Sequence, residues 1–192
     1  MAGALSGIYV ILLIAFVLVN VIAVVGGVVW AICKALKMKD KKGIRAMISS
    51  IICILVAACA WIFNFGWLRL VLTVMLVPFI HAIIFFITNT CASKYMDKSK
   101  KMKVCIWLFY ITYLLAYIML PDCDDVKTYM FFGLIRDDLA EQSITNIGFI
   151  VSNISCLIHI IVFVLQIVEI RRIKKEEKAE ALNETTETES GL

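Results

Sequence analysis

Five long stretches of this 192-residue sequence contain no Asp, Glu or Lys, and only one of them contains an Arg, close to its first residue. The sequence also lacks a polar stretch long enough to form a second domain with its own core. Its composition is 62% hydrophobic, with a mean hydropathy of +0.93, whereas a soluble domain contains about 45–50% apolar residues. The missing charge therefore excludes an ordinary soluble domain and predicts a polytopic integral membrane protein.

The sequence also lacks the motifs of common enzymes and metal sites. No GxSxG, HExxH, P-loop or CxxC pattern is present, so we expect neither an enzyme of these classes, nor a cofactor, nor a structural metal site. The seven cysteines are scattered over the predicted helices and both predicted sides of the membrane, which does not suit a disulfide framework. The net charge of +4 comes from Lys and Arg beside apolar stretches, so we expect a lipid environment and no nucleic-acid partner.

The apolar stretches predict an all-α bundle of five transmembrane helices, at about residues 7–32, 46–63, 68–90, 104–120 and 144–168. About 20 apolar residues suffice to cross a hydrocarbon core of about 30 Å. The six residues before the first stretch carry no basic side chain, so we expect an uncleaved first helix rather than a signal peptide. Residues 1–175 are predicted to form the transmembrane domain, and residues 176–192 an acidic, Thr-rich, disordered cytoplasmic tail.

The basic residues predict the orientation of the bundle. Sixteen of the 19 Lys and Arg residues fall within residues 34–45, 91–103 and 171–178, and the other three are Arg69, Lys127 and Arg136. Because basic segments stay in the cytoplasm, we expect the N-terminus outside and the C-terminus inside. Residues 122–143 then form an acidic outer loop, whose apolar centre predicts an interfacial helix at about 126–136. Lys- and Ile-rich usage favours a bacterial inner membrane.

Pro78 and His81 lie near the midpoint of the third predicted helix. Proline removes a backbone donor and predicts a kink, while a titratable side chain at that depth needs a partner or a water-filled cavity. His159 is predicted to lie at a similar depth in the fifth helix. The helical face that carries His159 is the most polar in the sequence, and we expect it to point inward. That face also carries Thr145, Gly148, Ser152, Ser155 and Gln166.

The buried polar residues near the midplane are the candidates for a ligand site or a proton path. They are His81, His159, Asn20, Tyr113, Ser155 and Gln166. The functional interpretation is a relay or binding site, and the alternative is a hydrogen-bonded network that fixes helix packing. The absence of acidic side chains from the predicted helices opposes coupled cation transport. Two histidines without a third ligand do not predict zinc.

The acidic outer loop offers a second candidate. Asp122, Asp124 and Asp125 are oxygen ligands of the kind that a divalent cation prefers, but the loop lacks the glycine and distal glutamate of a calcium-binding loop. An ordinary acidic loop is the alternative. Arg69, at the outer end of the third predicted helix, is expected to pair with one of these acids or with a lipid phosphate.

Three functions are compatible with these features. The leading hypothesis is a small non-enzymatic membrane protein that binds a protein partner, or a second copy of itself, in an accessory, assembly or immunity-type role. A small transporter or channel with a polar path past His81 and His159 is the alternative. A lipid-modifying enzyme that uses the outer aspartates with a metal is a weaker one.

Overall fold

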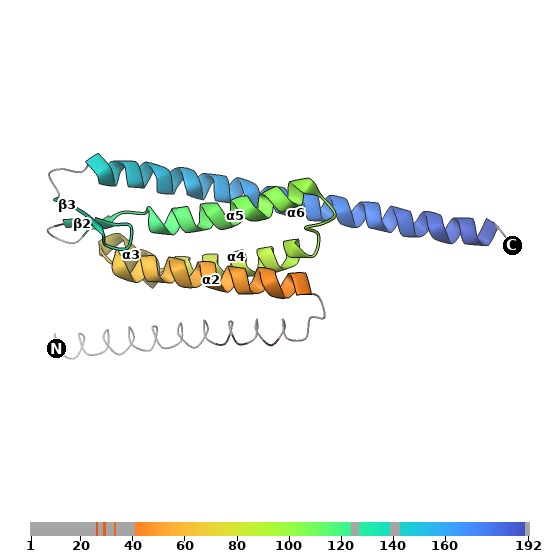
Figure 1. The fold of residues 1–192 in the computed structure, drawn as a ribbon, viewed down its shortest axis with the longest axis horizontal. Coiled ribbons are helices and arrows are strands. Elements are labelled where there is room, and N and C mark those ends of the chain that lie inside the picture. The colour runs from red at the N-terminus through yellow and green to blue at the C-terminus, as the bar shows by residue number, and fades with distance from the viewer. Residues whose placement is uncertain are drawn as a thin grey trace, which may run out of the picture.

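The computed structural model describes residues 41–123, 127–138 and 143–190, together with Gly26, Val29 and Cys33. The predicted first transmembrane helix and Asn20 therefore lie outside the continuous described segments. The described chain forms α2 (Lys41–Phe63), α3 (Trp67–Val74), α4 (Val77–Ser93), α5 (Lys100–Ile118), β1 (Asp122–Cys123), β2 (Lys127–Met130), β3 (Ile135–Asp138) and α6 (Ser143–Ser190). The long helices run roughly side by side, and the small sheet lies at one end of the bundle (Figure 1).

Three helical segments of the described chain are long and apolar enough to cross a membrane. They are Gly43–Phe63, Lys100–Ile118 and Ile144–Asn183. The pair α3 and α4 makes a fourth if it counts as one broken crossing. The described chain is thus mainly helical, with helices of membrane-spanning length, as the apolar stretches predict.

The third predicted helix is interrupted just before Pro78. Helices α3 and α4 meet at an angle of 67°, and Leu76 between them has the left-handed φ of 63°. Pro78 is the second residue of α4. It has no N–H to donate to Val74, and its ring would collide with that carbonyl in a continuous helix. The predicted kink is therefore present as a full break.

The predicted interfacial helix at about 126–136 is wrong, because this segment forms strands β2 and β3. With β1 they make an antiparallel sheet in the order β1-β2-β3. Thr128 pairs with Asp137 and Met130 with Ile135. The turn between the strands has positive φ at Phe131, Phe132 and Gly133. A helix cannot accommodate three such residues in succession, and glycine at φ 71° costs little.

The predicted disordered tail, residues 176–192, is also largely wrong, because α6 continues to Ser190. Its charged part is rich in Lys, Glu and Ala, which favour helix, and Arg172 pairs with Glu176 one turn later at 3.2 Å. Figure 1 shows α6 running well past the ends of its neighbours.

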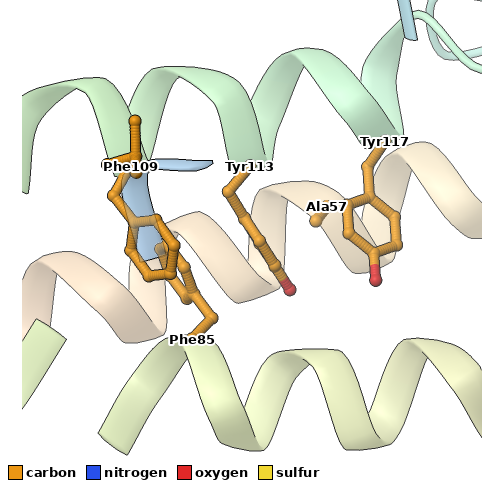
Figure 2. Packing of buried hydrophobic residues seen from close by; sticks show 6 residues of the cluster. Ala57, Phe85, Phe109, Tyr113 and Tyr117 are labelled. Carbon is orange, nitrogen blue, oxygen red and sulfur yellow. The ribbon is translucent and has the colours of Figure 1, made fainter. Parts of the chain in front are cut away.

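Two apolar clusters hold α2, α4, α5 and α6 together. The first contains Ala57, Phe85, Phe109, Tyr113, Tyr117 and Val162. The second, nearer the end opposite the sheet, contains Ala92, Met102, Ile106 and Ile173. Figure 2 shows the α5 rings of the first cluster directed toward α2 and α4. The candidate site lies within and between these clusters.

Candidate functional site

The structure brings the only two histidines of the sequence into contact. The ring centroids of His81, from α4, and His159, from α6, are 4.9 Å apart, and the rings are nearly perpendicular. His159 is 5% exposed. Helices α4 and α6 both run away from the sheet end. His81 and His159, which the sequence predicts to lie at equal depth, are therefore neighbours between the two helices.

Each histidine forms a hydrogen bond with a side chain of α5. The Nδ1 of His81 lies 3.0 Å from the Tyr117 hydroxyl, and the Nδ1 of His159 lies 3.0 Å from Oγ1 of Thr112. The Thr112 hydroxyl also donates to the Leu108 carbonyl at 2.8 Å. The single hydroxyl proton of Thr112 is used in this bond. The Thr112 oxygen therefore accepts from His159, and the Nδ1 of His159 carries a proton.

Aromatic rings surround the two histidines. Phe109 stacks on His159 with centroids 3.9 Å apart, and Phe85 stacks on Tyr113 at the same separation. Tyr113 is 5.1 Å from His81. Stacked rings at these distances leave no room between them for another molecule. Phe109 therefore packs directly on His159, and Phe85 packs directly on Tyr113.

The polar face of α6 is buried against the bundle. Its buried residues include Thr145, Gly148, Ser152, Ser155, His159, Gln166 and Glu169. The Ser152 hydroxyl donates to the Ala116 carbonyl of α5 at 2.8 Å. The Ser155 side chain, one turn before His159, is also buried. The inward direction predicted from the sequence is confirmed, and this face carries the contact between α5 and α6.

Two buried amides stand apart from this network. Asn89 and Gln166 are both fully buried, yet none of their side-chain oxygen or nitrogen atoms has a hydrogen-bond partner. Gln166 could be predicted from the polar face of α6, whereas Asn89 could not be predicted from the position of His81. Asn89 follows His81 by eight residues, which places it about 80° away around α4.

The polar residues nearest the sheet form a separate network around Arg69 and Asp122. The Asp122 carboxylate accepts from the backbone N–H groups of Gly66, Leu68 and Arg69, at 2.8–3.0 Å. These are the first free donors of α3, so Asp122 caps that helix from a distant part of the chain. Gly66 is required here, because a Cβ would lie 2.5 Å from the Cys123 carbonyl oxygen.

The Arg69 guanidinium joins the ends of α2 and α5. It donates to the Ala60 carbonyl and, at 2.6 Å, to the Leu120 carbonyl. It also lies over the Trp61 ring, 5.1 Å from its centroid. Its Nε is 3.9 Å from the Asp122 carboxylate, and both side chains are fully buried. The pairing of Arg69 with an outer acid, one of the two alternatives from the sequence, is the one observed.

This geometry leaves Asp122 with a structural role. Both carboxylate oxygens are occupied by backbone donors, including the Cys123 N–H at 2.9 Å, so Asp122 is not placed to bind a cation. Asp124 and Asp125 lie outside the described residues. Within the described segments, no cluster of three His, Cys, Asp or Glu residues is able to hold a metal ion.

A cavity of about 420 Å³ lies beside the break between α3 and α4. Its walls are mainly apolar side chains of α2 and α4, and Pro78, Thr73, Tyr113 and Tyr117 also line it. The cavity thus reaches the tyrosines of the aromatic layer, but neither His159 nor Gln166 belongs to its lining.

The opposite end of the bundle is held by contacts between the α4–α5 connection and α6. The Ser99 hydroxyl donates to Glu169 at 2.6 Å, and Lys98 forms an ion pair with Glu177. The hydrogen bond to Glu177 raises the pKa of Lys98 above its ordinary value. These contacts fix the start of α5 against α6.

The fold and the buried layer define a class of protein, namely a mainly helical chain with long apolar helices around a histidine-aromatic core. Comparison of the sequence and structure with family models, curated proteins and solved structures finds no match. The functional argument therefore depends on the geometry described above.

Proposed function

We propose that the chain is a multi-pass protein of a bacterial plasma membrane, with five crossings, its N-terminus outside and its C-terminus in the cytoplasm. The starts of α2 and α5, the end of α4 and the basic part of α6 lie at the same end of the bundle (Figure 1). These segments hold most of the Lys and Arg residues of the sequence. Gathering of basic segments on one side supports this orientation.

Thiol labelling in intact cells tests the orientation. Single-cysteine variants that retain Cys123, at the sheet end, are expected to react with a membrane-impermeant reagent. Variants that retain Cys33 or Cys91 are expected to react only after the cells are permeabilised. The reverse pattern would show that the chain is inserted the other way round, and labelling of all three in intact cells would exclude the five-crossing topology.

We propose that the protein is not an enzyme and acts by binding a protein partner, in an accessory, assembly or immunity-type role. The observation that carries this proposal is the length of α6, which projects beyond the other helices (Figure 1). The projecting part exposes Leu182, which is 69% exposed, among charged residues. A helix can dock in a groove of a partner through exposed apolar side chains, and Leu182 is such a side chain on an otherwise polar part of α6.

Affinity capture in mild detergent tests this proposal. The full chain is expected to retain a defined partner, and Leu182→Lys is expected to lose it while the protein still folds. Ala179→Ser, another exposed change on the same part of α6, is the matched control and should retain the partner. If the full chain and Leu182→Lys capture the same proteins in the same amounts, the projecting helix is not the binding element.

A small transporter or channel is the second candidate, and the unpaired amides of Asn89 and Gln166 favour it, because polar groups without partners suit a passing ligand. The stacked rings around His159 oppose transport, because they close the bundle on the sheet side of the two amides. Solute flux into liposomes that disappears in His159→Ala would favour transport, and flux equal to that of empty liposomes would exclude it. A lipid-modifying enzyme would use Asp122, Asp124 and Asp125, and of these only Asp122 is among the described residues. Asp122 caps α3, and this role disfavours the enzyme.

A further inference from the structure

Asn89 and Gln166 are fully buried amides with unpaired donors and acceptors. Each side chain has one oxygen and one NH₂ group, and all four atoms lack a hydrogen-bond partner among the described residues. Leaving a buried polar group unpaired costs about 1–3 kcal/mol. Such a cost at two side chains of facing helices requires an explanation, and an occupant that pairs with them is one.

The two amides lie in the same layer of the bundle. On α4, Asn89 falls between Phe85, of the first apolar cluster, and Ala92, of the second. On α6, Gln166 falls in the same way between Val162 of the first cluster and Ile173 of the second. Because each cluster contains residues of both helices, Asn89 and Gln166 lie at a similar depth in the bundle, between the two clusters. Asn89 and Gln166 therefore occupy one polar layer between two apolar ones.

The balance of donors and acceptors restricts the chemistry of the occupant. A cation would pair only with the two amide oxygens, and an anion only with the two NH₂ groups. A neutral molecule that both donates and accepts hydrogen bonds pairs with all four. Water is the smallest such molecule and typically makes about three hydrogen bonds when buried.

We propose that Asn89 and Gln166 together form a buried site for a small neutral molecule that donates and accepts hydrogen bonds, with water as its simplest occupant. Toward the sheet end, Phe85 and Phe109, whose rings are stacked 5.3 Å apart, close the site from the histidines. Toward the opposite end, Glu169 lies about 4.5 Å further along the α6 axis than Gln166. The hydrogen-bonded pair Ser99–Glu169 makes this the polar side of the site.

Nuclear magnetic resonance of the ¹⁵N-labelled full chain in lipid nanodiscs tests the site, with water as the probe. The side-chain NH₂ signals are assigned from their loss in Asn89→Leu and Gln166→Leu. Both NH₂ groups are expected to show cross-peaks to water. Because the two amides share the occupant, replacing one of them is expected to remove or strongly weaken the water cross-peak of the other.

Asn153→Leu is the matched control, because Asn153 is exposed on the same helix and donates to the Phe149 carbonyl at 2.7 Å. It should leave both water cross-peaks unchanged. Absence of water cross-peaks at both amides would overturn the proposal, as would a direct contact between the two amides without water. Water cross-peaks that survive replacement of the other amide would also overturn it, because the site would not be shared.

Thermal unfolding supplies a second measurement that does not depend on these signals. If the amides share an occupant, each leucine variant is expected to lower the Tm, and the double variant is expected to lower it by less than the sum of the two. Two unoccupied amides would behave differently. Each leucine would then raise the Tm, because it removes an unpaired polar group, and that result would overturn the proposal.

Discussion

Asp122 accepts a hydrogen bond from the backbone N–H of Arg69 at 2.8 Å, while the Arg69 side chain is directed to the carbonyl groups at the ends of α2 and α5. The carboxylate thus stabilises the amino end of α3, and the guanidinium stabilises the carboxyl ends of two other helices. The negative charge lies at the amino end of a helix and the positive charge at the carboxyl ends of two helices, where the helix dipoles favour them. Three helices and the sheet are joined through these two residues.

Replacement of Asp122 by Ala is expected to destabilise the protein strongly. It removes the acceptor of three α3 amides and leaves Arg69 as a buried charge without its counterion, which typically costs about 3–5 kcal/mol. The free energy of unfolding in mixed micelles measures the effect. Glu180→Ala, an acid on the projecting part of α6, is the control and should change it by less than about 0.5 kcal/mol. Equal effects of the two variants would contradict the capping role.

Gly66→Ala is expected to disturb the same end of the bundle for a steric reason. The new Cβ would lie 2.5 Å from the Cys123 carbonyl oxygen and 2.7 Å from Cγ of Asp122. The first of these is a backbone atom that cannot move alone, so a loss of about 1–3 kcal/mol is expected. Phe65→Ala, at an exposed neighbour, provides the comparison. A Gly66→Ala protein as stable as the parent would mean that β1 does not lie against Gly66.

Thr112→Val keeps the shape of the side chain but removes the partner of His159. The expected loss of stability is about 1–3 kcal/mol, because the buried His159 ring loses its side-chain hydrogen-bond partner. Thr90→Val is a matched control, since the Thr90 hydroxyl only donates to the Phe86 carbonyl within its own helix. The excess loss in Thr112→Val, measured by thermal unfolding, reports the histidine bond. No excess would indicate that the Thr112 hydroxyl does not contribute to holding His159.

Leu76→Gly tests the strain at the break between α3 and α4. A leucine in the left-handed region costs about 1–2 kcal/mol relative to its usual conformation, and glycine adopts it without that cost. Leu76→Gly is therefore expected to be less destabilising than Leu70→Gly, which places glycine within regular helix. A larger loss for Leu76→Gly would mean that α3 and α4 form a continuous helix.

The ion pair between Lys98 and Glu177 predicts a dependence on alkaline pH. Because the folded-state pKa of Lys98 lies above its ordinary value of 10.5, the contribution to stability is complete below pH 10.5 and is lost as the pH rises through the folded-state pKa. The Tm difference between the parent and Lys98→Ala should therefore shrink above this pH. It should also shrink in high salt, because the pair is exposed. Lys94→Ala, at an exposed lysine nearby, is the control, because it removes a positive charge but leaves the Lys98–Glu177 pair in place.

The sequence predicts best those features that follow from a repeating pattern or a single strong residue. The polar face of α6 repeats with helical spacing, so its burial could be foreseen from Thr145 to Gln166. Pro78 must interrupt a helix wherever it falls within one. The contact between His81 and His159 followed from equal depth in two helices that run in the same direction.

The features that the sequence did not predict depend on contacts between distant residues. The apolar content of residues 127–138 favours a helix over strands, whereas the burial of Met130 depends on a contact with Gly148 of α6 that is distant in sequence. The sequence left open whether Asp122 is a cation ligand or part of an ordinary acidic loop, because its partners, the backbone amides at the start of α3, are distant in sequence. The helical end of α6 was missed because a polar composition predicts disorder as readily as a solvated helix.

The cap of α3 also constrains the order in which the chain is assembled. The carboxylate that completes the amino end of α3 belongs to a residue 53 positions later than Arg69, on the far side of α4 and α5. A ribosome releases α3 long before it releases Asp122, so Arg69 can reach neither its counterion nor the Leu120 carbonyl until α4 and α5 have emerged. The sheet end of the bundle is consequently the last part of this region to mature, and a chain arrested before Asp122 would present an incomplete end to the cell's quality-control machinery.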